Sequence, residues 1–188
     1  MRMLHKTIAA SALVAGLSAM ATLPAAAEER VCRGSLGAIT VDNLRVPQGA
    51  TCTLTATRVQ GTVKVERSAT LTASRIVVIG NVQAEGAARV TVRSGSRVGG
   101  SIQVETGGAA TIANSVIDGS IQLVSNRGAL SVAANIVGSD VQAFQNRGGV
   151  SITDNRIDGN LQCKENVPAP VGGGNTVQGN KEDQCRRL

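Results

Sequence analysis

The chain of 188 residues has 19 Lys and Arg against 13 Asp and Glu, a formal net charge of +6, with one Phe and no Trp or Tyr. Its one His and all three Met lie within the first 27 residues. Residues 28–188 therefore cannot build a His-based triad, a His-ligated metal site or an aromatic platform for single-stranded nucleic acid. The arginines are interspersed with acids, which is typical of a solvated surface rather than a nucleic-acid footprint.

Residues 1–27 have the three parts of a secretory signal peptide. Arg2 and Lys6 precede an apolar run from Ile8 to Leu23, and small residues follow at 25–27. This order predicts cleavage after Ala27, one domain over 28–188 with a polar C-terminal tail, and a secreted or periplasmic destination. No later apolar run approaches the ~18 residues that a membrane span needs, so no span is expected.

Four cysteines follow in this exported chain, where disulfides persist. Cys32 and Cys52 are twenty residues apart, and Cys163 and Cys185 are twenty-two apart. If about twenty residues make one coil of a parallel β-solenoid, equivalent residues of adjacent coils lie ~4.8 Å apart, near the Cα separation of a disulfide. The spacing predicts Cys32–Cys52 and Cys163–Cys185, one bridge at each end. Free or metal-bound cysteines are disfavoured because there is no C-x-x-C pair.

A period of twenty residues is sharpest between Gly119 and Asn160. The tripeptide at 126–128, Asn-Arg-Gly, recurs at 146–148, and Asn135 recurs as Asn155 and Asn175. A fixed period of this size is the signature of a solenoid, in which each coil buries its apolar face by stacking on its neighbours. The repeated Asn side chains are expected at turns, where stacked amides bond the backbone and one another.

Apolar residues recur in three columns per period, with alternation inside each segment that is typical of strands. The first column is Val63, Val82, Ile102, Ile121, Val141 and Leu161; the second is Cys52, Leu71, Val90, Ala110, Leu130 and Val150; the third is Val98, Ile117, Val137, Ile157 and Val177. Abundant Gly and β-branched residues argue against helices. The sequence predicts an all-β, single-stranded parallel β-helix of seven or eight coils of about twenty residues, with a disulfide at both ends.

The stretch ITDNRIDGN, from Ile152 to Asn160, resembles the short repeats of the right-handed parallel β-helix superfamily, the pectate-lyase-like solenoids. The resemblance implies a right-handed winding. It implies little chemistry, because that superfamily includes polysaccharide lyases, polygalacturonases, phage tailspikes and surface proteins without catalysis. Bactofilins have similarly short coils, but they are typically cytoplasmic polymers without disulfides, and this chain departs on both counts.

The twenty-residue register aligns six hydroxyl residues on the second strand. This hydroxyl column consists of Thr53, Thr72, Thr91, Thr111, Ser131 and Ser151. A regular array of hydroxyls resembles the face of ice-binding β-solenoids and could equally bind a polysaccharide along its length. Thr also simply suits an exposed strand.

Two acidic groups are further candidates. Glu66, Glu85 and Glu105 form a column on the first strand, where they would need a cation such as calcium or nearby Arg67, Arg89 and Arg93 as partners. Asp118 and Asp158 share a column two coils apart, with Asp140 on the coil between them, at a separation near the upper limit for an inverting glycosidase. Asp before Gly is also ordinary turn chemistry.

These patterns favour an exported structural or binding β-solenoid, at the cell surface, in the periplasm or outside the cell. It would engage an extended polymer, a carbohydrate, or associate with itself, without a cofactor. The alternatives are a small polysaccharide hydrolase or lyase using Asp118, Asp140 and Asp158, and an ice-binding protein using the hydroxyl column.

Overall fold

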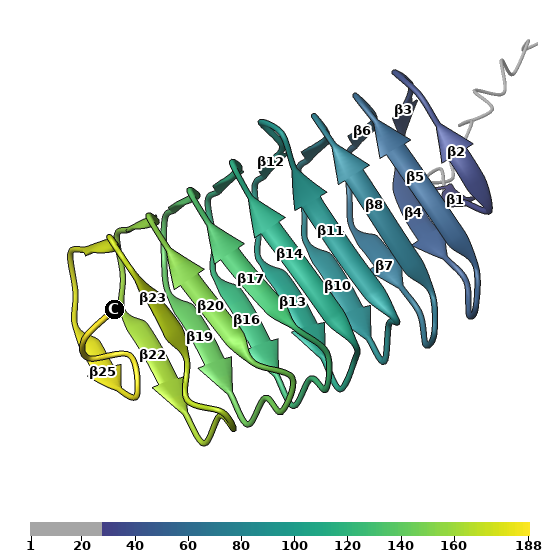
Figure 1. The fold of residues 1–188 in the computed structure, drawn as a ribbon. Coiled ribbons are helices and arrows are strands. Elements are labelled where there is room, and N and C mark those ends of the chain that lie inside the picture. The colour runs from purple at the N-terminus through teal and green to yellow at the C-terminus, as the bar shows by residue number, and fades with distance from the viewer. Residues whose placement is uncertain (1–27) are drawn as a thin grey trace, which may run out of the picture.

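The computed structural model describes residues 28–188, which form a parallel β-solenoid of about eight coils (Figure 1). The expected signal peptide lies outside the described residues. Each coil contributes one strand to each of three sheets, and all strand pairs are parallel. No helix within residues 28–188 is long and apolar enough to cross a membrane.

Strands that lie about twenty residues apart in the sequence pair side by side, which gives three long sheets. Sheet A has nine strands, namely β1 (Glu29–Val31), β4 (Asn43–Val46), β7 (Val63–Val65), β10 (Val82–Glu85), β13 (Ile102–Glu105), β16 (Ile121–Val124), β19 (Val141–Phe144), β22 (Leu161–Lys164) and β25 (Lys181–Asp183). Sheet B has eight, namely β2 (Gly34–Leu36), β5 (Thr51–Thr55), β8 (Thr70–Ser74), β11 (Arg89–Arg93), β14 (Ala109–Ala113), β17 (Leu130–Ala133), β20 (Val150–Thr153) and β23 (Val171–Gly173).

Sheet C is the narrow third side of the rod, with strands of two residues each. These are β3 (Thr40–Val41), β6 (Arg58–Val59), β9 (Val77–Val78), β12 (Arg97–Val98), β15 (Val116–Ile117), β18 (Ile136–Val137), β21 (Arg156–Ile157) and β24 (Thr176–Val177). Two residues allow only one inward side chain per strand. That single position is the third apolar column of the sequence.

The register confirms the apolar columns. Val82 pairs with Ile102 in sheet A, Val90 with Ala110 in sheet B, and Val98 with Ile117 in sheet C. The first and second columns are buried throughout, and the third is buried as far as Ile157. Because each inward side chain packs on its equivalents above and below, the core is a continuous stack of Val, Ile, Leu and Ala along the rod.

Both predicted disulfides are present, one near each end of the rod, with Cα separations of 5.6 Å for Cys32–Cys52 and 5.2 Å for Cys163–Cys185. The twenty-residue spacing predicts that the two cysteines of each bridge are ladder partners, but they are not. Cys52 pairs with Gly34 and Cys163 with Asp183, so each bridge runs diagonally to a cysteine two residues away from the paired one. All four cysteines are buried.

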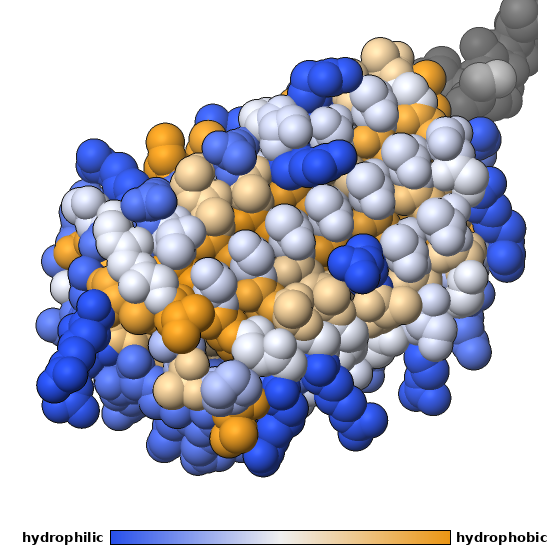
Figure 2. Space-filling model, in the orientation of Figure 1, coloured by the Kyte–Doolittle hydropathy of each residue, from blue (hydrophilic) through white to orange (hydrophobic). Residues whose placement is uncertain are grey.

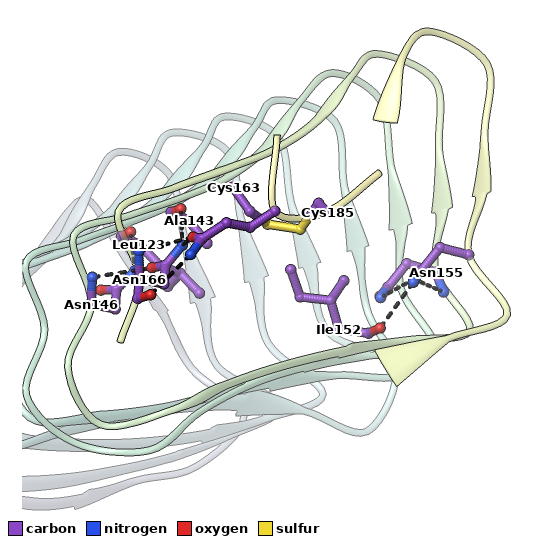
Figure 3. The surroundings of a disulfide bond; sticks show 10 residues. Leu123, Ala143, Asn146, Ile152, Asn155, Cys163, Asn166 and Cys185 are labelled. Atoms are coloured by element: carbon purple, nitrogen blue, oxygen red, sulfur yellow. Dashed lines mark hydrogen bonds between the residues drawn. A yellow bond between two sulfur atoms is a disulfide. The ribbon is translucent and has the colours of Figure 1, made fainter. Parts of the chain in front are cut away.

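Two buried amide ladders line the corners of the last three or four coils (Figure 3). One contains Asn126, Asn146 and Asn166, and the other contains Asn135, Asn155 and Asn175. The Oδ1 atom of Asn146 accepts both the backbone N–H of Asn126, at 2.9 Å, and its side-chain amide, at 3.1 Å. The expected amide stacking is confirmed, and no buried side-chain polar atom in the described residues lacks a partner.

Small residues occupy the same corners in the coils directly before the two ladders. Ser115 and Ser96 precede the second ladder, and their backbone or hydroxyl groups continue its bonding, as when Ser115 N–H donates to Asn135 Oδ1 at 3.1 Å. The first ladder starts where Gly107 N–H donates to Asn126 Oδ1 at 2.9 Å. The side chain at each corner therefore changes along the rod, from Ser or Gly to Asn, while the bond between coils is kept.

Candidate functional site

The hydroxyl column runs along the outer face of sheet B. Its six members occupy consecutive ladder positions, so that Thr53 pairs with Thr72, Thr91 with Thr111, and Ser131 with Ser151. Ser35 extends the column by one coil toward the N-terminal end, and Val171 ends it. Every one of the six side chains is half-buried, so each hydroxyl lies at the surface between its neighbours.

The columns on either side of these hydroxyls contain mostly small residues. Thr51 and Thr70 lead to Ala109 on one side, with Arg89 between them. On the other side Thr55 and Ser74 lead to Arg93, and Ala133 and Thr153 lie further along. In Figure 2 this face is broad and even, with rows of side chains of intermediate hydropathy and only isolated hydrophilic ones.

The charged residues of the sheet B strands are Arg89 and Arg93, at the two ends of β11. Both side chains are exposed, and Thr91 lies between them. Neither guanidinium group forms an ion pair or a hydrogen bond within residues 28–188. These two guanidinium groups had been expected as partners for the glutamates of sheet A, and they do not contact them.

On sheet A the glutamines form a hydrogen-bonded outer ladder. Gln83 donates to Gln103 at 3.2 Å, Gln103 to Gln122 at 2.9 Å, and Gln142 to Gln162 at 2.9 Å. These side chains satisfy one another, which stabilises the sheet in the same way as the internal amides.

Beside this ladder lies a half-open hollow with a volume of about 930 Å³, whose lining includes Glu66, Glu85 and Glu105. Glu66 forms an ion pair with Arg45 at 3.5 Å and accepts the backbone N–H of Gln48 at 2.9 Å. Glu85 and Glu105 are ladder partners. Among residues 28–188 no three His, Cys, Asp or Glu side chains lie close enough to hold a metal ion, so this geometry gives the calcium interpretation no support.

Arg45 is the centre of a small charged cluster near the N-terminal end. Its Nε atom lies 2.6 Å from a carboxylate oxygen of Glu29. The hydrogen bond and the charge of Glu29, together with Glu66, raise the pKa of Arg45 above its ordinary value. For Glu66, Arg45 is thus the partner in place of Arg67, Arg89 and Arg93, whereas Glu85 and Glu105 form no ion pair within residues 28–188.

Asp118 and Asp158 lie at equivalent positions two coils apart, as expected, and each is engaged by a neighbour. Arg97 Nη2 donates to both oxygens of Asp118 at 3.0 Å. Asp158 accepts from Gln178 at 2.9 Å and lies 3.6 Å from Arg156. Both side chains are exposed on the narrow edge of the rod.

Asp140 belongs to a third ladder, at the corner between sheets C and A. Its Oδ1 atom accepts the backbone N–H of Asn160 at 2.7 Å, and its own N–H donates to Ser120 Oγ at 3.3 Å. Equivalent bonds link other coils: Ser120 N–H donates to Ser101 Oγ, and Asn180 N–H donates to Asn160 Oδ1. The Asp140 carboxylate thus bonds the backbone of the next coil, while the Asp118 and Asp158 carboxylates bond side chains on the narrow edge.

This corner ladder was missed in the sequence because its members change chemistry from coil to coil. They are Asn43, Asn81, Ser101, Ser120, Asp140, Asn160 and Asn180. All of them except Asn180 use a short side chain to accept a backbone N–H of the next coil. Asn43 is the first residue of its sheet A strand, and the others lie one position before theirs. A search for residues able to accept a backbone N–H at a step of nineteen or twenty residues would have found them.

No protein-family model, no curated protein and no solved structure matches the chain. What the fold defines is a class, a disulfide-bonded parallel β-solenoid. Its two disulfides indicate an oxidising environment.

Proposed function

We propose that the protein is an exported binding module whose sheet B face holds an extended carbohydrate polymer. The observation that supports this most is the hydroxyl column itself, six hydroxyls in register on a face of small side chains. A hydroxyl both donates and accepts, as sugar hydroxyls do. Successive coils repeat at ~4.8 Å, so a polymer lying along the rod axis meets the same group at each step.

Other features of the chain agree with this proposal. The disulfides fit an exported protein, and residues 1–27 carry the pattern of a signal peptide. The absence of Trp and Tyr means that the sugar would be held by hydrogen bonds and small methyl groups rather than by stacking on rings. The resemblance to right-handed parallel β-helix repeats is part of the same proposal, since several such proteins bind polysaccharides.

The test is binding to a glycan array by the wild type and by Thr111→Tyr, which puts a ring in the middle of the hydroxyl column. Thr176→Tyr is the matched control, because Thr176 is an exposed strand residue on sheet C. Binding that is lost in Thr111→Tyr and kept in Thr176→Tyr supports the proposal. Binding by neither the wild type nor the control, or equal binding by all three, rules it out.

Ice binding is a second candidate, favoured by the evenness of the same face. The N-terminal half is the better match, because Thr51, Thr53 and Thr55 are all on β5 and Thr70 and Thr72 follow on β8. Thermal hysteresis that disappears in Thr72→Tyr would support this function. The absence of hysteresis in the wild type would exclude it.

A further inference from the structure

The outer face of sheet B has an uneven charge. Its eight strands contain no Asp or Glu, and their charged residues are Arg89 and Arg93. Sheet A differs, because its outward residues include Lys64, Glu85, Glu105 and Glu182. All charged residues on the strands of sheet B, which carries the hydroxyl column, are therefore positive.

The guanidinium groups of these two arginines form no ion pair with other residues in the described part of the chain. The ion pairs found there use Arg45, Arg97 and Arg156, each facing a carboxylate on its own or a neighbouring coil. Arg89 and Arg93 are exposed, and neither forms an ion pair within residues 28–188. Neither arginine is therefore held in place by an ion pair with another part of the rod.

Their placement on one strand positions them for a shared ligand. Alternation puts residues 89, 91 and 93 on the same side of β11, with the guanidinium stems about 13 Å apart at ~3.3 Å per residue. Their ladder neighbours are small: Arg89 lies between Thr70 and Ala109, and Arg93 follows Ser74. Nothing on the adjacent strands shields either charge.

We infer that the polymer held by sheet B is an anionic polysaccharide, whose carboxylate or sulfate groups bind Arg89 and Arg93 while its hydroxyls contact the hydroxyl column. This inference rests on the proposed function and specifies its ligand. A guanidinium presents two parallel N–H donors that match a carboxylate or a sulfate. The pair lies near the middle of the rod, so an acidic chain along the column meets both charges together.

The test compares matched polymers. Polygalacturonate is measured against its methyl ester, and dextran sulfate against dextran, by calorimetry or affinity electrophoresis with the full chain at low and high salt. The wild type should bind at least one acidic polymer ten times or more as tightly as its neutral partner, with affinity falling as salt rises. Binding of polygalacturonate alone assigns a carboxylate ligand, and binding of dextran sulfate alone assigns a sulfate.

The double variant Arg89→Ala/Arg93→Ala should lose on the order of tenfold or more in affinity for the acidic polymer, from the loss of two charge-assisted contacts. Arg89→Lys/Arg93→Lys should recover part of it, because charge returns without the bidentate geometry. Arg58→Ala is the control, since Arg58 is an exposed strand arginine on sheet C that forms no ion pair with any residue from 28 to 188. It should bind within twofold of the wild type.

The outcomes separate the two proposals. Equal affinity for acidic and neutral polymers, or equal losses in the Arg58 and the Arg89/Arg93 variants, would overturn the anionic ligand while leaving the sheet B proposal to the Thr111→Tyr result. No binding to any polymer would overturn both. Double-stranded DNA bound as tightly as the acidic polysaccharides would refute the carbohydrate assignment.

Discussion

The buried amide ladder gives the sharpest prediction about stability, at Asn146. This side chain is fully buried and bonds three coils at once. Its Oδ1 accepts from Asn126, and its Nδ2 donates to the backbone carbonyl of Leu123, at 2.9 Å, and to Asn166 Oδ1, at 2.9 Å. Replacing Asn146 with Ala removes all of these bonds, because the alanine side chain has no donor or acceptor.

The expected loss follows from the groups left without a partner. In Asn146→Ala the backbone N–H of Asn126 and the carbonyl of Leu123 lose the bonds that the side chain supplied. Each buried polar group without a partner costs about 1–3 kcal/mol, so we expect a loss of about 4 kcal/mol in the free energy of unfolding. That is a large part of the 5–15 kcal/mol typical of a domain.

The measurement is equilibrium urea unfolding followed by far-ultraviolet circular dichroism, because the chain has no Trp or Tyr for fluorescence. Asn180→Ala is the control: Asn180 is exposed, and its side-chain amide makes no hydrogen bond to the described part of the chain. The loss in this variant should stay within about 0.5 kcal/mol. An Asn146→Ala variant within 1 kcal/mol of the wild type would refute the reasoning, and so would equal losses in both variants.

Three further changes test other parts of the rod. Cys32→Ser/Cys52→Ser should lower the free energy of unfolding by about 3 kcal/mol, since the bridge closes a loop of about twenty residues, and thermal or urea unfolding measures this. Gly148→Ala should cost more than 2 kcal/mol by urea unfolding, because an added Cβ would clash with the backbone of Gly128 in the preceding coil. Arg45→Met should cost less than 1 kcal/mol and only at low salt, because the ion pair with Glu29 is largely exposed; a larger loss that persists at high salt would contradict this.

The sequence alone predicts the coiled arrangement of the strands, because an apolar residue recurs at the same position of each coil. A Val, Ile or Leu in one coil requires another apolar residue above it, so the columns through Val82 and Val90 could be written from the period alone. The disulfide pairing followed from the same period. Its diagonal geometry did not, since the exact register of the first coil depends on turn lengths that the repeat does not specify.

The turns themselves were harder to predict. Many coils change direction through a residue with positive φ that is not glycine, such as Ala56, Arg75 and Gln145, with φ of 55°, 55° and 58°. This conformation costs roughly 1–2 kcal/mol for an ordinary residue, and stacking in register holds it in place. Residue preferences favour Gly or Asn at positions with positive φ. They therefore do not predict a turn at Ala, Arg or Gln, where the neighbouring coils impose the conformation.

The location of polar side chains along the rod bears directly on function. At the corners Asn, Ser and Asp140 are used to bond one coil to the next, and on sheet A the glutamines bond one another. The carboxylates of Asp118, Asp158 and Glu66 are paired with arginines. Sheet B carries no comparable network of long side chains, and Arg89 and Arg93 have no partner within the described residues. A face whose hydroxyls and guanidinium groups are not needed to hold the coils together has them available for a ligand, which is why we place binding there.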